Sequence, residues 1–215
     1  MSLVSALFKR YFMPSKPKKH YSLEEYFEIE LNSEIKYEYW DGQIFAMSGA
    51  SPEHNEIAVN LIREISNQLK GRQCKVFNSD QRVKVPIWPP YRYPDLVALC
   101  GKPEYETIGG VKTLLNPTLI IEVLSPSTEA FDRGDKFSYY KSIPSFCEYI
   151  LVAQHRPHIT QIVKQGDNKW LISEVNELES TVYLSSIDCS LLLSDVYLGV
   201  EFPPLSQSLL GERLE

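Results

Sequence analysis

The stretch PDLVALCGKPEYETIGGVKTLLNPTLIIEVLSP, residues 94–126, places one acidic residue in each of two apolar runs. Asp95 opens the first run, and Glu122 lies inside the second. Because side chains alternate between the two faces of a strand, Glu122 shares a face with Ile120 and Leu124. If the two runs form neighbouring strands in register, the two carboxylates meet at one end of a sheet.

Two carboxylates in a medium of low dielectric constant repel each other unless a cation neutralises them. Mg²⁺ suits such a pair, because it binds one or two carboxylates, keeps several waters and accepts phosphate oxygens. A metal ion there would polarise a phosphodiester and supply an activated water. The pair therefore predicts a metal site. The alternative for Asp95 is a structural role as a turn residue that begins a strand.

A lysine lies in the segment that follows, STEAFDRGDKFSYYKSI, residues 127–143. We expect a helix near 128–142, which places Asp132, Lys136 and Tyr140 at successive i,i+4 positions. Lys136 can then point back over the end of the sheet, where an ammonium would orient water and stabilise transition-state charge. The alternative is an ordinary surface ion pair between Asp132 and Lys136, worth less than about 1 kcal/mol.

An acidic residue also lies in a predicted hairpin, EIKYEYWDGQIFAMSG, residues 34–49. Two strand-forming runs flank Asp41-Gly42, which is a strong signal for a two-residue hairpin loop. This loop places Glu38 opposite Phe45, an unusual position for a solvated acid. Glu38 is a candidate site residue, and the alternative is an ion pair with Lys36.

A histidine begins the longest predicted helix, SPEHNEIAVNLIREISNQLK, residues 51–70. Ser51 is a suitable N-cap and Pro52 suits the first helical position. His54 falls in the first turn on the apolar stripe of the helix, so it is a second candidate site residue. The alternative is that His54 serves only the N-terminus of its own helix.

The remaining pattern predicts one α/β domain over residues 22–215, after a basic arm over residues 1–21. The arm holds five lysine or arginine residues and no acidic residue. It could contact phosphates, and a solvated tail is the alternative. A short helix follows Ser22. Strands are expected over 75–78, 82–85, 95–99, 118–124 and 148–152, and a hairpin over 159–163 and 170–175.

Composition favours a globular protein, with 43% apolar residues in a chain of 215. The sequence has no run of 18 apolar residues and no secretory signal pattern, which predicts a cytoplasmic protein without membrane spans. The net charge is −6, and six acids without any lysine or arginine lie between Trp170 and Gly211. The four cysteines have no CxxC spacing, so we expect reduced, unpaired thiols and no zinc.

Pro94-Asp95 followed by Glu122-Val123-Leu124 resembles the motif of the PD-(D/E)XK nuclease superfamily. More narrowly, the chain resembles the Uma family of that superfamily in four ordered blocks, YEYWDGQIFAMSGASPEHNEIAVNL, YRYPDLVAL, LIIEVLSPSTEAFDRGDKFSYYKS and CEYILV. The resemblance implies a restriction-endonuclease-like core, with a mixed central sheet flanked by helices and an N-terminal hairpin. It also implies a Mg²⁺- or Mn²⁺-dependent endonuclease that hydrolyses phosphodiester bonds of DNA.

The resemblance further assigns roles to individual residues. Asp95 and Glu122 correspond to metal ligands, with Glu38 and His54 as further site residues. The lysine position of the general motif is Leu124, and Lys136 matches the lysine that the Uma pattern carries in the next helix. The alternative function is a non-catalytic binding or assembly module that retains the nuclease fold. Cleavage of both DNA strands would favour a two-fold homodimer.

Overall fold

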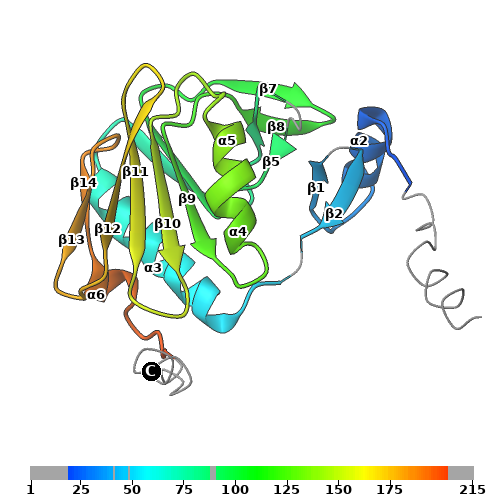
Figure 1. The fold of residues 1–215 in the computed structure, drawn as a ribbon. Coiled ribbons are helices and arrows are strands. Elements are labelled where there is room, and N and C mark those ends of the chain that lie inside the picture. The colour runs from blue at the N-terminus through cyan, green and yellow to red at the C-terminus, as the bar shows by residue number, and fades with distance from the viewer. Residues whose placement is uncertain (1–18, 41, 48, 88–90, 203–215) are drawn as a thin grey trace, which may run out of the picture. The chain divides into compact units, whose positions relative to one another are not determined.

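The computed structural model describes residues 19–40, 42–47, 49–87 and 91–202 (Figure 1). The chain divides into two compact units, Met1–Met47 and Ser48–Glu215. The predicted basic arm lies outside the described residues as far as residue 18. The single domain expected over residues 22–215 stays a prediction.

The first unit begins with helix α2 (Leu23–Leu31), which confirms the helix expected after Ser22. Ser22 Oγ accepts a hydrogen bond from Glu25 N, and Glu25 Oε2 accepts one from Ser22 N. This reciprocal capping box satisfies two backbone donors at the start of the helix. Tyr26, on the inner face of α2, is fully buried.

The hairpin of the first unit is formed by β1 (Tyr37–Trp40) and β2 (Gln43–Ala46). The strands are antiparallel, and Glu38 lies opposite Phe45, as the sequence predicted. Gly42 has a φ angle of +71°, a conformation that glycine adopts without steric cost. The side chain of Glu38 is half-buried.

The second unit is built on a sheet of six strands in the order β12-β11-β10-β9-β6-β3. The strand β9 runs parallel to β10, and the other neighbours are antiparallel, so the sheet is mixed. Every residue of β9 and β10 is buried, because the sheet is covered on both faces. The bounds are β3 (Cys74–Asn78), β6 (Leu96–Cys100), β9 (Leu119–Leu124), β10 (Glu148–Ala153), β11 (Ile159–Gly166) and β12 (Lys169–Val175).

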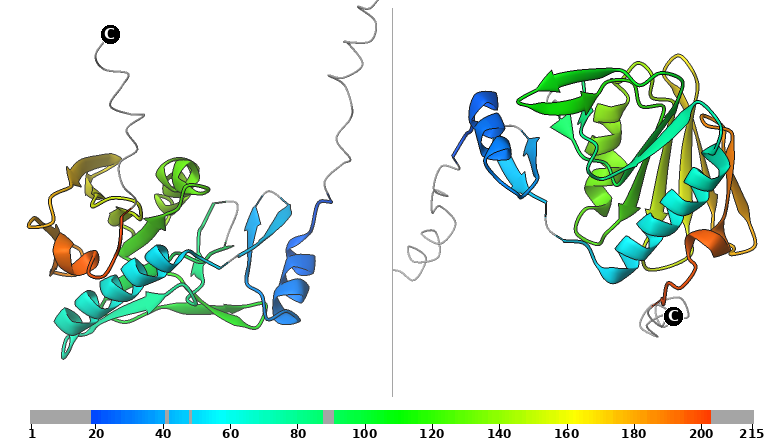
Figure 2. Two further views of the ribbon diagram at one scale, coloured as in Figure 1. Left: turned by 90° about the horizontal axis from the view of Figure 1, so that it is seen from below. Right: turned by 180° about the vertical axis from the view of Figure 1, so that it is seen from behind.

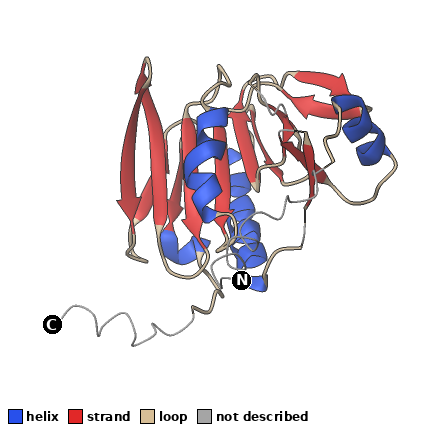
Figure 3. Ribbon diagram, turned by 45° about the vertical axis from the view of Figure 1, so that its right-hand side comes forward, coloured by secondary structure: helices blue, strands red, loops and turns tan. Residues whose placement is uncertain are grey.

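Helices cover both faces of this sheet, as Figures 2 and 3 show. Helix α3 (Pro52–Leu69) covers one face, where Ile57, Leu61 and Ile65 are fully buried. Ser51 caps α3, and Pro52 begins it, as predicted. The segment that contains α4 (Glu129–Phe131) and α5 (Phe137–Tyr140) covers the other face. The predicted mixed α/β architecture is therefore confirmed.

The strand expected over 82–85 corresponds to β4, but several other small elements escaped the sequence analysis. A second sheet has the order β5-β4-β8-β7, and a separate two-stranded sheet pairs β13 with β14. Short strands carry little periodicity, which explains why most of them were missed. Their bounds are β4 (Val83–Lys84), β5 (Tyr91–Arg92), β7 (Tyr105–Ile108), β8 (Val111–Leu114), β13 (Thr181–Leu184) and β14 (Cys189–Leu192), and α6 (Leu193–Val196) follows β14.

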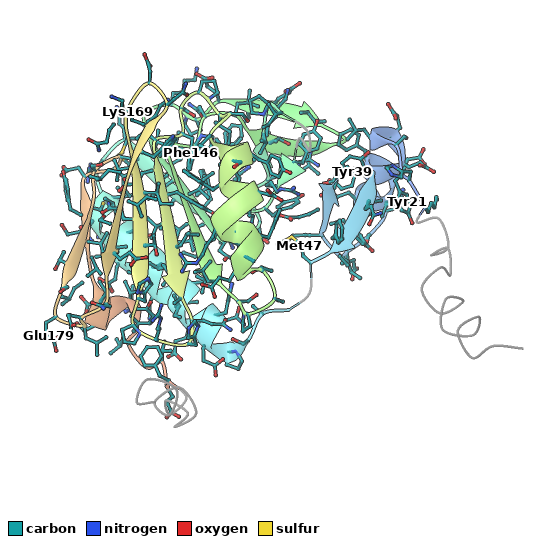
Figure 4. All side chains as sticks on the ribbon, viewed as in Figure 1. Tyr21, Tyr39, Met47, Phe146, Lys169 and Glu179 are labelled. Carbon is teal, nitrogen blue, oxygen red and sulfur yellow. A yellow bond between two sulfur atoms is a disulfide. The ribbon has the colours of Figure 1, made fainter. Side chains whose placement is uncertain are left out.

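The face beneath α5 is rich in aromatic side chains. Tyr140, Phe146 and Tyr149 are buried there, with ring centroids 5.7 to 6.0 Å apart. Figure 4 labels Phe146 on this face. Phe137 stacks on Tyr149 at 5.5 Å. These contacts fix α5 firmly against the sheet.

The continuous helix expected over 128–142 is wrong in one respect. A π-helical turn, η1 (Asp132–Lys136), lies between α4 and α5. A single π-helical turn inside a helix is rare and occurs often at functional sites. The i,i+4 pattern of the sequence did not reveal it, because an α-helix and a helix with one widened turn show nearly the same apolar spacing.

The expectation of four unpaired cysteines is also wrong. Cys74 and Cys100 form a disulfide, whereas Cys147 and Cys189 are free. Cys74 lies directly opposite Cys100 in the pairing of β3 with β6. The spacing of the cysteines along the chain could not show this pairing. A long connecting segment joins β3 to β6, and the register of the two strands is not evident from the sequence.

Of the helices in the described part of the chain, none has the length and apolar character needed to cross a bilayer.

Asn60 fastens α3 to the segment around α6 and provides a test of this packing. Its Nδ2 atom donates to Val196 O at 3.1 Å and to Leu198 O at 2.9 Å, and the side chain is buried. We expect Asn60→Ala to lower the free energy of unfolding by about 2 kcal/mol, because buried carbonyl groups lose their donor. Urea unfolding measures this loss, with the exposed Asn67→Ala as the control on the same helix. Equal stability of the two variants would contradict it.

Candidate functional site

The two carboxylates of the opening motif meet where β6 begins. Leu96, the first residue of β6, pairs with Ile121 of β9, which places Asp95 beside Glu122. Asp95 N lies 3.4 Å from Glu122 Oε2, and Val123 N donates to Asp95 Oδ2 at 2.7 Å. The predicted meeting of the two acids at one end of the sheet is therefore observed.

Glu122 is deeply buried, with an exposed fraction of 2%. The hydroxyl group of Tyr140 donates to Glu122 Oε1 at 2.9 Å. Burial raises the pKa of Glu122 to about 8, although the Lys136 charge opposes this shift. The negative charges of Asp95 and Asp132 add to the rise. Glu122 therefore sits in a site that disfavours its negative charge.

Lys136 supplies a positive charge to the same oxygen atom of Glu122 that Tyr140 contacts. Its Nζ atom lies 2.9 Å from Glu122 Oε1 and 3.0 Å from Asp132 Oδ1. Asp132 and Lys136 are both buried, so the alternative of a surface ion pair is wrong. The π-helical turn η1 begins at Asp132 and ends at Lys136, so it directly determines where the ammonium group lies.

His54 reaches the group from the first turn of α3. Its Nε2 atom lies 3.2 Å from Asp95 Oδ2. Burial alone would lower the pKa of His54, but the hydrogen bond and charge of Asp95, with the charge of Asp132, outweigh it and raise the pKa. The backbone N of His54 donates to Ser51 Oγ, so the N-cap holds the first turn of α3 in place. His54 Nδ1 is buried without a hydrogen-bond partner among the described residues.

The five side chains form an acidic group with incomplete neutralisation. Asp95, Glu122 and Asp132 carry three carboxylates, and Lys136 and His54 supply an ammonium and an imidazole. Glu122 and Asp132 are buried and Asp95 is partly exposed, and such an excess of carboxylates attracts a cation. Within the described residues, no group of three or more His, Cys, Asp or Glu side chains is arranged to hold a metal ion. A two-carboxylate site with water in the other positions matches the preference of Mg²⁺.

The structure brings together four of the five candidate residues from the sequence, Asp95, Glu122, Lys136 and His54. Glu38 belongs to the first compact unit, and its role stays a prediction. The sequence indicates Tyr140 only by its spacing from Lys136. In the structure, Tyr140 contacts Glu122 directly. Its position four residues after Lys136 was the available signal, but spacing alone does not distinguish a core tyrosine from one that binds a carboxylate.

The fold defines a class of protein. A solved structure described as "a putative nuclease belonging to DUF820 from Anabaena variabilis ATCC 29413" matches this chain with a TM-score of 0.63 and 17% identity. The match covers 82% of this chain and 97% of that chain. At this level of identity the likeness shows the fold alone. The chain therefore shares the α/β fold of that solved structure.

A family model identifies the chain more narrowly. The model of Uma2, described as "Putative restriction endonuclease", matches residues 23–192. The chain belongs to the Uma2 family, which confirms the resemblance found in the sequence. The match includes both compact units, from α2 to β14.

Two relatives from Synechocystis sp. (strain ATCC 27184 / PCC 6803 / Kazusa) support this assignment. "Uncharacterized protein slr1290" is 36% identical over 189 residues, which cover 88% of this chain and 97% of the relative. "Uncharacterized protein sll1609" is 35% identical over 151 residues, which cover 70% of this chain and 85% of the relative. The family is thus shown over most of the chain.

The charge imbalance of the site predicts that removal of the two partners of its ion pair has unequal effects on stability. Lys136→Met leaves the carboxylates of Asp95, Glu122 and Asp132 without their ammonium, so we expect a loss of about 3–5 kcal/mol. Glu122→Gln leaves Lys136 with Asp132 and relieves repulsion, so a change below about 1 kcal/mol is expected. Urea unfolding in the presence of a chelator measures both, with Lys169→Met as the exposed control. A larger loss for Glu122→Gln would show that this acid is mainly structural.

Proposed function

We propose that this protein is a metal-dependent endonuclease that hydrolyses phosphodiester bonds of DNA in the cytoplasm. The observation that carries the proposal is the buried contact of Lys136 with Glu122, beside which Asp95 lies within hydrogen-bond range. An ion pair in the interior costs several kcal/mol in lost hydration, and a scaffold without activity has no need to retain it. Membership of the Uma2 family supports a nuclease.

Asp95 and Glu122 are the metal ligands in this proposal. Asp95 Oδ2 is occupied by Val123 N and His54, and Glu122 Oε1 by Tyr140 and Lys136. The proposed ligand atoms are therefore Asp95 Oδ1 and Glu122 Oε2, of which Glu122 Oε2 has only the 3.4 Å contact with Asp95 N. Oxygen donors of this kind suit Mg²⁺ or Mn²⁺ better than a thiophilic metal. The metal would polarise the phosphodiester and lower the pKa of a bound water.

Lys136 has the role of orienting the attacking water and stabilising negative charge on the phosphorus oxygens. Its ammonium group is held by Glu122 and Asp132 on an element packed firmly against the sheet. A donor that is fixed before the reaction costs little reorganisation when the charge develops. A lysine on a helix can thus replace the strand lysine of the general motif, where this chain has Leu124.

The other polar residues position these groups. His54 bonds to Asp95 Oδ2, which restricts rotation of that carboxylate, and Tyr140 does the same for Glu122. Asp132 restrains Lys136. We include Glu38 as a further site residue on the basis of the family resemblance. A homodimer related by a two-fold axis would place two such sites on the two strands of DNA.

The alternative is a binding or assembly module that keeps the fold without catalysis. The overall charge of −6 favours this alternative, since it does not attract DNA. Incubation of plasmid DNA with the purified protein, with and without Mg²⁺ or Mn²⁺, tests the proposed activity. Nicked or linear plasmid that depends on the metal supports the nuclease, and intact plasmid under all conditions supports the module.

Metal binding is a separate prediction with a readout that does not need activity. We expect Mn²⁺ or Mg²⁺ at millimolar concentration to bind the native protein and raise its melting temperature, because a ligand of the folded state stabilises it. Calorimetric titration measures the binding directly. The Asp95→Asn/Glu122→Gln variant should lose it, and equal heats from variant and wild type would rule out this site.

The role of Lys136 predicts a loss of catalysis without a loss of metal binding, measured under conditions in which the destabilised Lys136→Met variant is still folded. We expect Lys136→Met to lower plasmid cleavage by roughly 100-fold or more, as loss of one transition-state donor does. Lys136→Arg should recover only part of the rate, since a planar guanidinium does not replace a compact ammonium. Lys169→Met is the control for loss of a lysine elsewhere.

A second lysine position tests whether the amine alone matters. Leu124 lies two residues after Glu122 on the same strand face, so Leu124→Lys in the Lys136→Met background introduces an amine near the same carboxylates. Recovered cleavage would show that the two positions converge. Wild-type cleavage by Lys136→Met itself would contradict the proposed role of Lys136.

A further inference from the structure

The Cys74–Cys100 disulfide lies at the end of β6 remote from Asp95. It joins β6 to β3, the edge strand of the six-stranded sheet. Gly101 N donates to Gln73 O, so the next residues inward, Cys74 and Cys100, form a non-hydrogen-bonded pair. Opposite residues approach most closely at such positions, and the two Cα atoms are 3.9 Å apart. Cys100 lies five positions after Asp95 along the strand, a distance of about 17 Å at ~3.4 Å per residue.

A hollow of about 310 Å³ adjoins this disulfide. It is lined by Arg72, Gln73, Cys74, Lys75, Gly101 and Lys102, a set with three cations and no acid. Cys100 is exposed, and Cys74 is partly exposed. The disulfide is therefore open to solvent at Cys100, and its other residue, Cys74, lines the basic hollow.

The three cations differ in how far they are already neutralised. Arg72 Nη2 lies 3.7 Å from Asp188 Oδ2 and donates to Ile187 O at 2.7 Å. Lys75 and Lys102 are exposed and form no ion pair within the described part of the chain. Two ammonium groups thus remain to attract an anion to the disulfide.

We propose that the Cys74–Cys100 disulfide is a thiol–disulfide exchange site that takes small anionic thiols. The thiolate of the incoming molecule attacks Cys100 Sγ, which belongs to the more exposed of the two residues. The S–S bond breaks, and its electron pair leaves on Cys74 Sγ as a thiolate beside the cations of the hollow. This step leaves the small thiol joined to Cys100 as a mixed disulfide.

A second thiolate completes the reaction by attacking the sulfur of the bound small molecule. The small-molecule disulfide is released, and Cys100 and Cys74 each take up a proton as thiols. Two small thiols are thereby oxidised, and one protein disulfide is reduced. Low leaving-group pKa speeds such exchange, and neighbouring cations lower the pKa of a thiol. The hollow therefore favours both the arrival of an anionic thiol and the departure of Cys74.

The test compares three thiols of similar size and different charge on the oxidised, full-length protein. Mercaptoacetate, 2-mercaptoethanol and 2-aminoethanethiol are reacted with it at low salt, and thiol release is followed. Each rate is expressed per thiolate and divided by the rate of the same thiol with bis(2-hydroxyethyl) disulfide. We expect the corrected rate to fall in the order anionic, neutral, cationic, by roughly 10-fold overall, and the difference to shrink at 1 M salt.

Variants locate the effect in the hollow. Lys75→Gln/Lys102→Gln should abolish the preference for mercaptoacetate. The control variant Lys164→Gln/Lys169→Gln removes the same charge from the β11–β12 hairpin, where Figure 4 labels Lys169. This control should retain the preference for mercaptoacetate. Corrected rates that do not depend on thiol charge, or that change equally in both variants, would overturn the proposal. Titration of four free thiols in denatured, air-oxidised protein would overturn it as well.

Discussion

The contact of Lys136 with Glu122 is the interaction on which the rest of the site depends. Glu122 lies on a strand buried along its whole length, so water cannot solvate its charge. Removal of both charges from water costs several kcal/mol each, and only a close partner with further hydrogen bonds offsets this. Tyr140 and Asp132 provide those further contacts. The aromatic packing that fixes α5 thereby also fixes the ammonium over the sheet.

Asp95 is tied to Glu122 through the backbone of the sheet itself. The amide of Asp95 lies beside the Glu122 carboxylate, and the amide of Val123 donates to the Asp95 carboxylate. Each acid is therefore oriented by the strand that carries the other. The pairing of β6 with β9 is at once a part of the core and the element that sets the distance between the two carboxylates. Fold stability and site geometry cannot be varied independently here.

Sequence reasoning worked where local chemistry is strong and failed where distant segments meet. The turn at Gly42, the Ser51 cap and the strand of Glu122 each carry a signal within a few residues, and the structure has the corresponding elements. The meeting of Asp95 with Glu122 followed from strand alternation once the two strands were taken as neighbours. The disulfide needed the register of β3 against β6, and the π-helical turn needed tertiary packing, so neither could be read from spacing.

The π-helical turn also makes the geometry of the site depend on the number of residues within Asp132–Lys136. Such a turn holds one residue more than the α-helical turn that it replaces. Each residue rotates a helix by about 100°. Loss of one residue within Asp132–Lys136 would therefore turn Lys136 away from Glu122. In genetic terms, an in-frame deletion of one codon in η1 would damage the site more than most substitutions there. Comparison of family members by a fixed glutamate-to-lysine spacing would misplace this lysine for the same reason.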